Sequence, residues 1–321
     1  MRMIITGGSG FMGSNAVEYF KNKGYGVLSI DIKPPRDKNH RPFWKKCDIL
    51  DAASLKRIFQ NFQPDLLLHL AARTDLKEKK RLQGYAANID GVRNVIAAAN
   101  ATERLKRILF ASSRMVCRID YQPKNETDVC PPNLYGESKV LTEQIIRSAS
   151  IKSEWVIVRP TSIWGPWFDI PYKTFFTTIA RRMYFKISGF NPLKSFGFVL
   201  NTMDQIDKLF QAPSDVVDEK TLYLCDYPPL EVNHWADLIR RRMNLPPIHT
   251  VLWYLLKLGA FLGDFLSILG FDRFPITTFR LNNLVTDMVY DTILLESICG
   301  SLPFSLEQGV NMTVKWMNDQ T

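Results

Sequence analysis

A tyrosine and a lysine, Tyr135 and Lys139, lie one helical turn apart. Side chains at this spacing project from the same face of a helix. An ammonium held near a phenol stabilises the phenolate, which lowers the pKa of the tyrosine towards neutrality and lets it exchange a proton with a substrate hydroxyl. The two residues are therefore a candidate acid/base pair, although this spacing is common by chance.

Two consecutive serines, Ser112 and Ser113, end an apolar segment that we expect to form a β-strand near residues 107–112. Open parallel sheets bind their ligands at the carboxyl edge of the strands, which is where these hydroxyls would lie. A serine at that edge could hold a substrate oxygen beside Tyr135.

A glycine-rich loop, residues 6–13, joins the first expected strand to an apolar helix. Gly7 permits a tight turn, Gly10 lets the backbone approach a pyrophosphate, and Gly13 lets the helix pack closely on the sheet. The helix N-terminus supplies N–H groups and a positive dipole. This loop therefore predicts a dinucleotide site.

An aspartate, Asp31, stands at the end of the next expected strand. A carboxylate at this position accepts hydrogen bonds from the ribose hydroxyls of a dinucleotide. Its negative charge would repel the 2′-phosphate of NADP, so the sequence favours NAD as the cofactor. Lys33 and Arg36 follow closely and weaken that preference.

Short apolar segments alternate with helical patterns through the first half of the chain, which is typical of βαβ units and a parallel sheet. The patterns predict strands near 2–6, 26–31, 65–70, 107–112, 155–159 and 221–225, and helices near 11–23, 51–61, 84–101, 135–149, 231–243 and 305–318. We therefore predict an α/β fold with a Rossmann-type, doubly wound parallel sheet over 1–160, to which part of 196–225 could return. A smaller, mixed α/β substrate lobe is expected over 161–321.

The composition bounds the protein class. The chain has 321 residues, of which 46% are hydrophobic and 23% charged, as in folded globular proteins. Its five cysteines are scattered without metal-ligand spacing, which predicts a reducing, cytoplasmic setting and no metal site. The net charge of +9 favours anionic partners, but no aromatic-interleaved basic motif indicates nucleic acid.

Residues 251–271 are apolar and come close to transmembrane length, but Lys257, Asp264 and several glycines interrupt them. Two central charges disfavour a membrane span. We expect a helix that packs within the second lobe. The alternative is a helix that lies on the inner face of the membrane as a peripheral contact.

Several motifs together resemble those of a known family. The matching residues are TGGSGFMG at 6–13, Asp31, Cys47-Asp48-Ile49, His69-Leu70-Ala71-Ala72, Asn88 with Gly91, Ser112-Ser113, Tyr135 with Lys139, Arg159-Pro160 and Gly165-Pro166. The chain thus resembles, over essentially its whole length, an extended short-chain dehydrogenase/reductase of the NAD-dependent sugar epimerase/dehydratase group.

The resemblance implies roles for individual residues. Tyr135 would be the acid/base, Lys139 its pKa partner and ribose ligand, and Ser113, which lies three residues before Val116, the hydroxyl that orients the substrate oxygen. The expected cofactor contacts are Gly7, Gly10, Phe11, Met12, Gly13, Asp31, Asp48 and Ile49 beside the adenine, Ala71 and Ala72 behind the cofactor, Asn88, Tyr135, Lys139 and Pro160. The expected substrate contacts are Arg73, Ser112, Ser113, Ser162 and Trp164, with core packing as an alternative for Trp164. His69 lies inside an apolar strand and is expected to be a packed, hydrogen-bonded histidine.

Some positions depart from the family pattern. Dehydratases of this group usually carry an Asp-Glu pair directly after the catalytic hydroxyl residue, whereas this chain has Arg114 and Met115, so a 4,6-dehydratase is disfavoured. The usual tyrosine after Val116 is Cys117. Ser162 replaces an asparagine that helps to hold a substrate diphosphate.

The leading hypothesis is an NAD-dependent sugar epimerase, in which Tyr135 takes a proton from a ring hydroxyl, usually at C4, while hydride passes to NAD and then returns to the other face. The sugar would be carried on a nucleotide or a polyprenyl diphosphate, in polysaccharide biosynthesis. The alternatives are a net dehydrogenase or reductase of a keto sugar or sterol-like hydroxyl, and a non-catalytic dinucleotide sensor. Relatives often form homodimers through the helices that correspond to 84–101 and 135–149.

Overall fold

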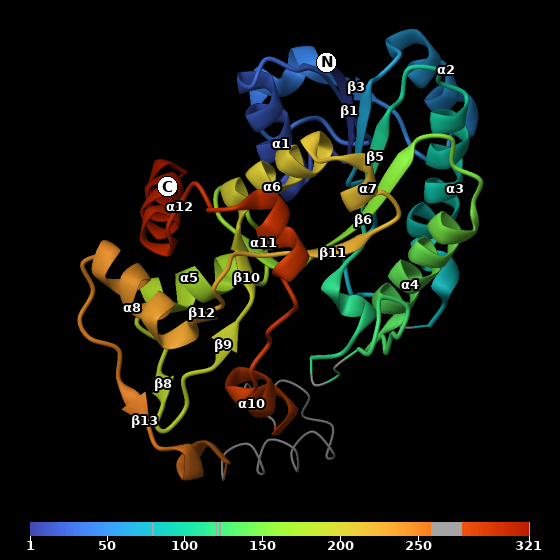
Figure 1. Ribbon diagram of the computed structural model, residues 1–321. Coiled ribbons are helices and arrows are strands. Elements are labelled where there is room, and N and C mark those ends of the chain that lie inside the picture. The colour runs from blue at the N-terminus through green and yellow to red at the C-terminus, as the bar shows by residue number, and fades with distance from the viewer. Residues whose placement is uncertain (79, 120, 122, 258–277, 321) are drawn as a thin grey trace. The chain divides into compact units, whose positions relative to one another are not determined.

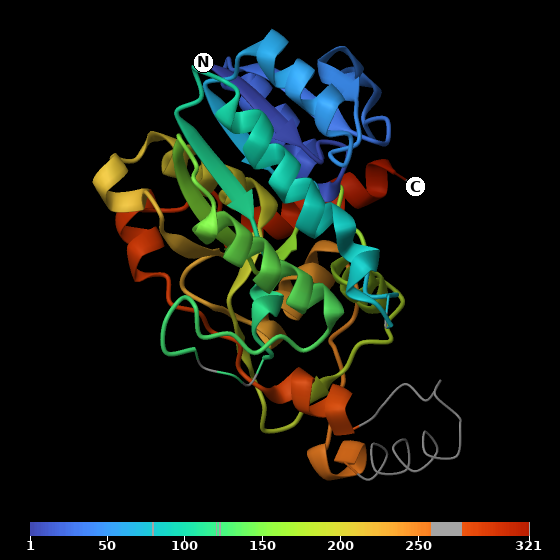
Figure 2. The same ribbon diagram turned by 90° about the vertical axis from the view of Figure 1, so that its right-hand side faces the viewer.

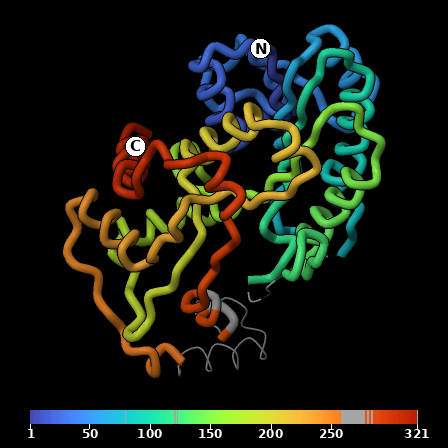
Figure 3. The backbone as a smooth tube through the Cα atoms, viewed as in Figure 1, coloured from blue at the N-terminus to red at the C-terminus, as the bar shows by residue number. Residues whose placement is uncertain are grey.

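The computed structural model describes residues 1–78, 80–119, 121, 123–257 and 278–320. The chain folds into two compact units and passes between them several times (Figure 3). Unit 1 consists of Met1–Ile163, Gly197–Cys225 and Asp291–Pro303, and unit 2 of Trp164–Phe196, Asp226–Tyr290 and Phe304–Thr321. The sequence suggested that part of 196–225 returns to the first domain, but it offered no sign that 291–303 does so too.

Among the described residues, unit 1 contains a seven-stranded parallel sheet in the order β11-β6-β5-β4-β1-β2-β3 (Figure 1). The strands are β1 (Arg2–Thr6), β2 (Gly26–Asp31), β3 (Trp44–Lys46), β4 (Leu66–His69), β5 (Arg107–Ala111), β6 (Glu154–Pro160) and β11 (Thr221–Leu224). The predicted Rossmann-type fold is confirmed. The short strand β3 was not predicted, because it pairs along only three positions at the edge of the sheet.

Helices cover both faces of this sheet. The helices of unit 1 are α1 (Phe11–Asn22), α2 (Ala52–Phe62), α3 (Ala86–Asn100), α4 (Leu134–Ser148), α6 (Val199–Gln211), α7 (Ser214–Val217) and α11 (Ile293–Cys299), with 3-10 turns η1 (Lys38–Phe43), η2 (Leu82–Tyr85) and η3 (Arg114–Val116). Helices α2, α3 and α4 pack side by side on one face (Figures 1 and 2), and α1, α6 and α11 pack on the other. The sheet is therefore buried on both sides, as the continuous apolar runs predict.

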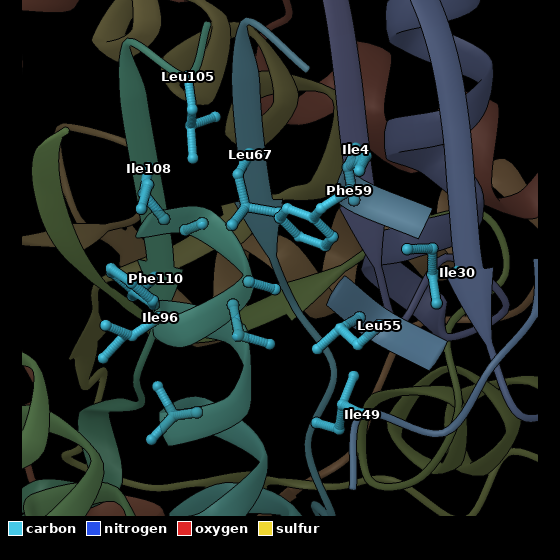
Figure 4. Packing of buried hydrophobic residues seen from close by; sticks show 14 of the residues in the cluster. Ile4, Ile30, Ile49, Leu55, Phe59, Leu67, Ile96, Leu105, Ile108 and Phe110 are labelled. Carbon is cyan, nitrogen blue, oxygen red and sulfur yellow. The ribbon is translucent and has the colours of Figure 1, made fainter. Parts of the chain in front are cut away.

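The strand register builds the core. Ile4, Leu67 and Ile108 are partners across β1, β4 and β5, so their side chains form one row on the same face of the sheet. Leu55 and Phe59 of α2 pack against this row (Figure 4). Because β4 is buried along its whole length, it holds the centre of the sheet in place.

A buried ion pair anchors α4 to the sheet. Arg159 of β6 donates from Nε to Oε1 of Glu143 at 2.9 Å and from Nη2 to Oε2 at 2.7 Å. The side chains of Arg159 and Glu143 are only 1% and 5% exposed. Ser112, at the end of β5, donates to the same Oε1 at 2.6 Å. One carboxylate thus fixes α4 to two neighbouring strands.

Unit 2 contains α5 (Tyr172–Ala180), α8 (Val232–Arg242), α10 (Thr278–Val285) and α12 (Leu306–Asp319). Its short strands pair as β8 (Lys186–Ile187) with β13 (Thr250–Val251) and β9 (Leu193–Lys194) with β12 (Leu230–Glu231). The strands β7 (Ser162–Trp164) and β10 (Phe196–Phe198) also pair. Aromatic side chains, including stacked Phe175 and Trp235, form much of its core.

Within the described ranges, no helix has the length and hydropathy needed to cross a membrane. Most of the segment 251–271, for which a membrane contact was one alternative, lies in 258–277 and hence outside the described residues.

Replacing Arg159 by methionine tests the anchor. The Glu143 carboxylate would stay buried without its partner, so we expect the free energy of unfolding to fall by about 3–5 kcal/mol. Urea denaturation followed by circular dichroism measures this change.

Arg93→Met is the matched control, because the 2.8 Å ion pair of Arg93 with Asp90 is exposed at both ends. Its loss should cost less than about 1 kcal/mol. Equal losses in the two variants would contradict an anchoring role for Arg159.

Candidate active site

The glycine loop lies at the carboxyl edge of β1 and packs against the loop after β4. Gly7 has a positive φ of 73°, and a Cβ there would lie 2.7 Å from the backbone nitrogen of Ala71. A Cβ on Gly13 would lie 2.1 Å from the carbonyl oxygen of Gly7. Both positions therefore exclude any larger residue, and α1 begins directly after Gly10 with its first turn close to the loop.

This loop fits the pyrophosphate of a dinucleotide. The helix N-cap is Gly10, which has no side chain to cap the helix, so the first N–H groups of α1, at Phe11, Met12 and Gly13, remain available for an anion. Gly10 itself donates its N–H to the carbonyl oxygen of Gly7 at 3.0 Å, which keeps the turn tight.

Asp31 stands beside the same loop, at the end of β2. Its Oδ2 accepts a hydrogen bond from the Ser9 nitrogen at 3.0 Å, and its Oδ1 accepts one from the Lys33 nitrogen at 2.9 Å. Each carboxylate oxygen can accept a further bond, so both can also meet ribose hydroxyls. Arg36 donates from Nε to the Ser9 carbonyl at 3.0 Å. The residues thus fit an adenosine ribose at this corner.

The residues expected beside the adenine follow β3. Asp48 is exposed, and its Oδ1 accepts a hydrogen bond from the Leu50 nitrogen at 2.9 Å. Ile49 is buried in the core cluster, and its carbonyl oxygen accepts a hydrogen bond from Asn94 at 3.0 Å. The Ile49 side chain thus belongs to the core, and the adenine contact expected for Ile49 stays a prediction.

His69, at the end of β4, is a structural residue. It is buried, and its Nδ1 shares a 2.7 Å hydrogen bond with the hydroxyl of Thr6, which also accepts from the Ala71 nitrogen at 3.2 Å. Burial, with help from the Lys139 charge, lowers the pKa of His69 to about 3. The imidazole is therefore neutral near pH 7 and holds the loop that carries Ala71 and Ala72.

Asn88 of α3 lies behind this loop, and its side-chain amide forms hydrogen bonds with protein groups. Its Oδ1 accepts from the Arg73 nitrogen at 2.8 Å, and its Nδ2 donates to the Arg73 carbonyl at 3.0 Å and to Ser138 at 2.8 Å. Asn88 thus positions this loop, and the cofactor contact expected for it stays a prediction. The Arg73 guanidinium donates to Asp75 and to the Gly84 carbonyl, at 2.8 Å in each case.

The two serines after β5 have different surroundings. The hydroxyl of Ser112 donates to Glu143, so it belongs to the anchor of α4. The hydroxyl of Ser113 accepts a 3.1 Å hydrogen bond from the Met115 nitrogen and also bonds to Tyr135. The structure therefore brings Ser113, and not Ser112, next to the candidate acid/base.

Tyr135 lies in the first turn of α4, capped by Asn133, and its side chain is 8% exposed. Burial raises the pKa of Tyr135, while the hydrogen bond with Ser113 and the charge of Arg114 act in the opposite direction. The sequence predicted a pKa lowered towards neutrality by Lys139. That prediction is wrong for the protein alone, because desolvation dominates and the Lys139 ammonium points elsewhere.

Lys139 is buried one turn further along α4. Its Nζ donates to the Ala111 carbonyl oxygen at the end of β5, at 2.7 Å. Burial lowers the pKa of Lys139 to about 8, although the Glu143 carboxylate raises it. Lys139 thus holds a costly charge at the edge of the sheet, beside the strand end that precedes Ser113.

The remaining predicted residues lie after β6. Pro160 ends the strand, and Ser162 is buried in β7. Trp164 is 0% exposed and packs against Phe176 and Trp235 in the core of unit 2. Trp164 therefore offers no surface to a substrate, which corrects the substrate-binding role considered for it.

Sequence reasoning missed three residues that shape this site. They are Thr6, which holds His69, Tyr85, whose ring lies 6.1 Å from that of Tyr135, and Glu143. Only Glu143 had a usable signal, because it continues the helix face of Tyr135 and Lys139 by one more turn. No group of three or more candidate ligands for a metal ion occurs in the part of the chain that the structure describes.

Comparison with known proteins agrees with this fold. The family model for the NAD dependent epimerase/dehydratase family matches residues 3–221, and the chain belongs to this family. NAD is its cofactor, and the glycine loop and Asp31 fit it. A relative from Escherichia coli O157:H7, N-acetyl-alpha-D-glucosaminyl-diphospho-ditrans,octacis-undecaprenol 4-epimerase, is 24% identical over 98% of this chain and 94% of its own length.

Two solved structures share the fold. UDP-glucose 4-epimerase from Thermotoga maritima, solved with UDP-glucose, superposes with a TM-score of 0.75 at 18% identity, covering 100% of this chain and 99% of its own. UDP-glucuronic acid 4-epimerase from Bacillus cereus, solved with UDP-glucuronic acid and NAD, has a TM-score of 0.74 at 16% identity and covers 100% of both chains.

The depressed pKa of Lys139 gives a test by pH. Folding lowers this pKa from 10.5 to about 8, so the unfolded chain binds the proton more tightly than the folded chain. The charged Lys139 therefore reduces the free energy of unfolding below pH 8, and this loss fades as the pH rises through 8. We expect the melting temperature of the wild type to rise relative to Lys139→Met between pH 7 and pH ~9.5.

Lys152→Met, which removes an exposed lysine of the same unit, is the control, and its difference from the wild type should not change with pH. Thermal melts of the cofactor-free protein at a series of pH values measure both. If the melting temperature of the wild type falls relative to that of Lys139→Met as pH rises, the buried charge on Lys139 is contradicted.

Proposed function

We propose that this protein is an NAD-dependent epimerase that inverts a ring hydroxyl, at C4, of a sugar carried on a diphosphate. The observation that carries the proposal is the hydrogen-bonded pair of Ser113 and Tyr135 at the carboxyl edge of the sheet that also carries the glycine loop. A reversible oxidation of an alcohol needs a hydroxyl that holds the substrate oxygen and a phenol that exchanges the proton of that same oxygen.

The residues of the site divide the work. Ser113 holds the substrate oxygen, and Tyr135 takes the hydroxyl proton as the carbon is oxidised and returns it after the sugar has turned over. Lys139 supplies a positive charge that favours the phenolate once a substrate displaces water. When bound, NAD supplies reversible hydride transfer, and the glycine loop, Asp31 and Lys139 would hold it.

The residues after Ser113 support epimerisation over dehydration. Elimination of water needs a further acid and base next to the reacting carbon, whereas this chain has Arg114 and Met115 there, in the turn η3. The positive charge of Arg114 opposes the rise that burial causes in the pKa of Tyr135, whereas an acidic pair would add to that rise.

We further propose a polyprenyl diphosphate as the carrier of the sugar. The support is the relative from Escherichia coli, whose name includes an undecaprenol diphosphate and which aligns over nearly the whole of both chains. The net charge of +9 suits the diphosphate of either carrier. A nucleotide carrier is the other arm of the test.

The test combines substrate turnover with one substitution. Purified protein is incubated with sugars on UDP and on a polyprenyl diphosphate, and inversion at C4 is followed by NMR. We expect turnover of the polyprenyl-linked sugar, and a loss of about 1000-fold in kcat for Tyr135→Phe. Tyr25→Phe removes the hydroxyl of a tyrosine that bonds to Asp207 and should keep the activity.

The outcomes separate the alternatives. Turnover of the nucleotide sugars alone would overturn the carrier and leave the epimerase. A keto product formed in step with NADH would overturn the epimerase in favour of a net dehydrogenase.

A further inference from the structure

The segment between β5 and α4 connects Ser113 to Tyr135, and its two ends are joined by a β-bridge. Cys117 and Cys130 are direct partners in this parallel bridge. Arg118 donates its N–H to the Cys130 carbonyl at 2.8 Å, and Cys130 donates to the Val116 carbonyl at 3.0 Å. The backbones of two cysteines are therefore paired in the segment that joins Ser113 to Tyr135.

Bridge partners carry their side chains on the same face, with backbones about 4.8 Å apart. A disulfide needs Cα atoms within about 4.4–6.8 Å and Cβ atoms at about 3.8 Å, so these two cysteines can be linked by a closure of about 1 Å. Close to Cys130, Asp128 accepts hydrogen bonds from Tyr121 at 2.5 Å and from the Lys124 nitrogen at 2.8 Å.

The two thiols differ in access. Cys130 is partly exposed, whereas Cys117 is 2% exposed and its Sγ donates to the Asp128 carbonyl at 3.7 Å. Burial raises the pKa of Cys117 and so lowers its thiolate fraction, which leaves Cys130 as the thiol that reacts first. Cys130 is therefore suited to meet a reagent from solvent, and Cys117 to complete an exchange from inside. The other three cysteines, Cys47, Cys225 and Cys299, are buried.

We propose that Cys117 and Cys130 form a reversible redox site, which a low-molecular-weight disulfide such as oxidised glutathione converts to an intramolecular disulfide that slows the enzyme. The Cys130 thiolate attacks the glutathione disulfide, forms a mixed disulfide and releases one glutathione thiolate. The Cys117 thiolate then attacks the Cys130 sulfur, the mixed disulfide breaks, and the second glutathione leaves. Two protein thiols are oxidised and one glutathione disulfide is reduced to two thiols.

The link would act on the site through its two flanks. One flank carries Ser113 and the turn η3, and the other leads into α4, where a Cβ on Gly136 would lie only 2.3 Å from the Met115 carbonyl. Packing this tight transmits a closure of about 1 Å to the bond between Ser113 and Tyr135. Misplacement on that scale can cost about 100-fold in rate. This effect on rate rests on the proposed function, whereas formation of the disulfide does not.

The experiment treats the intact protein with oxidised glutathione and reads intact mass, peptide map and activity. We expect the loss of two hydrogens, a crosslink between the peptides of Cys117 and Cys130, and a fall in turnover of about tenfold or more that dithiothreitol reverses. Cys130→Ser should show neither change. Cys117→Ser should stop at the glutathione adduct on Cys130, and Cys299→Ala should still form the crosslink.

Thiols that stay reduced, a glutathione adduct that persists in the wild type, or a crosslink to another cysteine would each overturn the redox site. A complete crosslink with unchanged turnover would overturn its control of the enzyme. If the reduced protein turns over no sugar, the proposed function fails, yet the mass and the peptide map still decide whether the disulfide forms.

Discussion

The rest of the site depends on one buried ion pair, between Glu143 of α4 and Arg159 of β6. Removing two charges from water is expensive, so such a pair persists only when its geometry and hydrogen bonds are nearly complete. Here Ser112 supplies the additional bond to the carboxylate, which links the pair to the end of β5. The pair therefore orients the helix face that carries Tyr135 and Lys139 relative to the two strands beside it.

The same helix face concentrates groups that the protein alone does not favour. Lys139 is charged in a buried place, and Tyr135 is a phenol whose ionisation burial opposes. Groups with perturbed pKa values of this kind cluster at functional sites. The charge of Arg114 opposes the effect of burial on the pKa of Tyr135, whereas the Lys139 ammonium bonds to the Ala111 carbonyl. The ion pair of Glu143 and Arg159 holds α4 in place although the burial of Lys139 is unfavourable.

The dinucleotide corner follows a different constraint, which is backbone contact. Gly7 and Gly13 lie where any side chain would strike the loop after β4 or the turn itself. Thr6 and His69 then bond across the ends of β1 and β4, and so fix the loop that begins at Ala71. A ligand at this corner would meet backbone N–H groups more than side chains, which explains why the glycine spacing, together with Asp31, predicted a dinucleotide site.

By itself, the sequence predicted the parallel sheet through its apolar periodicity and the glycine loop with Asp31 through spacing, because both signals are local. The choice of Ser113, Tyr135 and Lys139 as a catalytic set came from the resemblance to a family. The sequence also indicated that 196–225 could return to the first domain. Only the tertiary structure decided which partner each polar group bonds to. Asn88 holds a loop, Trp164 lies in a core, and Lys139 bonds to the Ala111 carbonyl, since burial and long-range partners are set by packing and not by spacing.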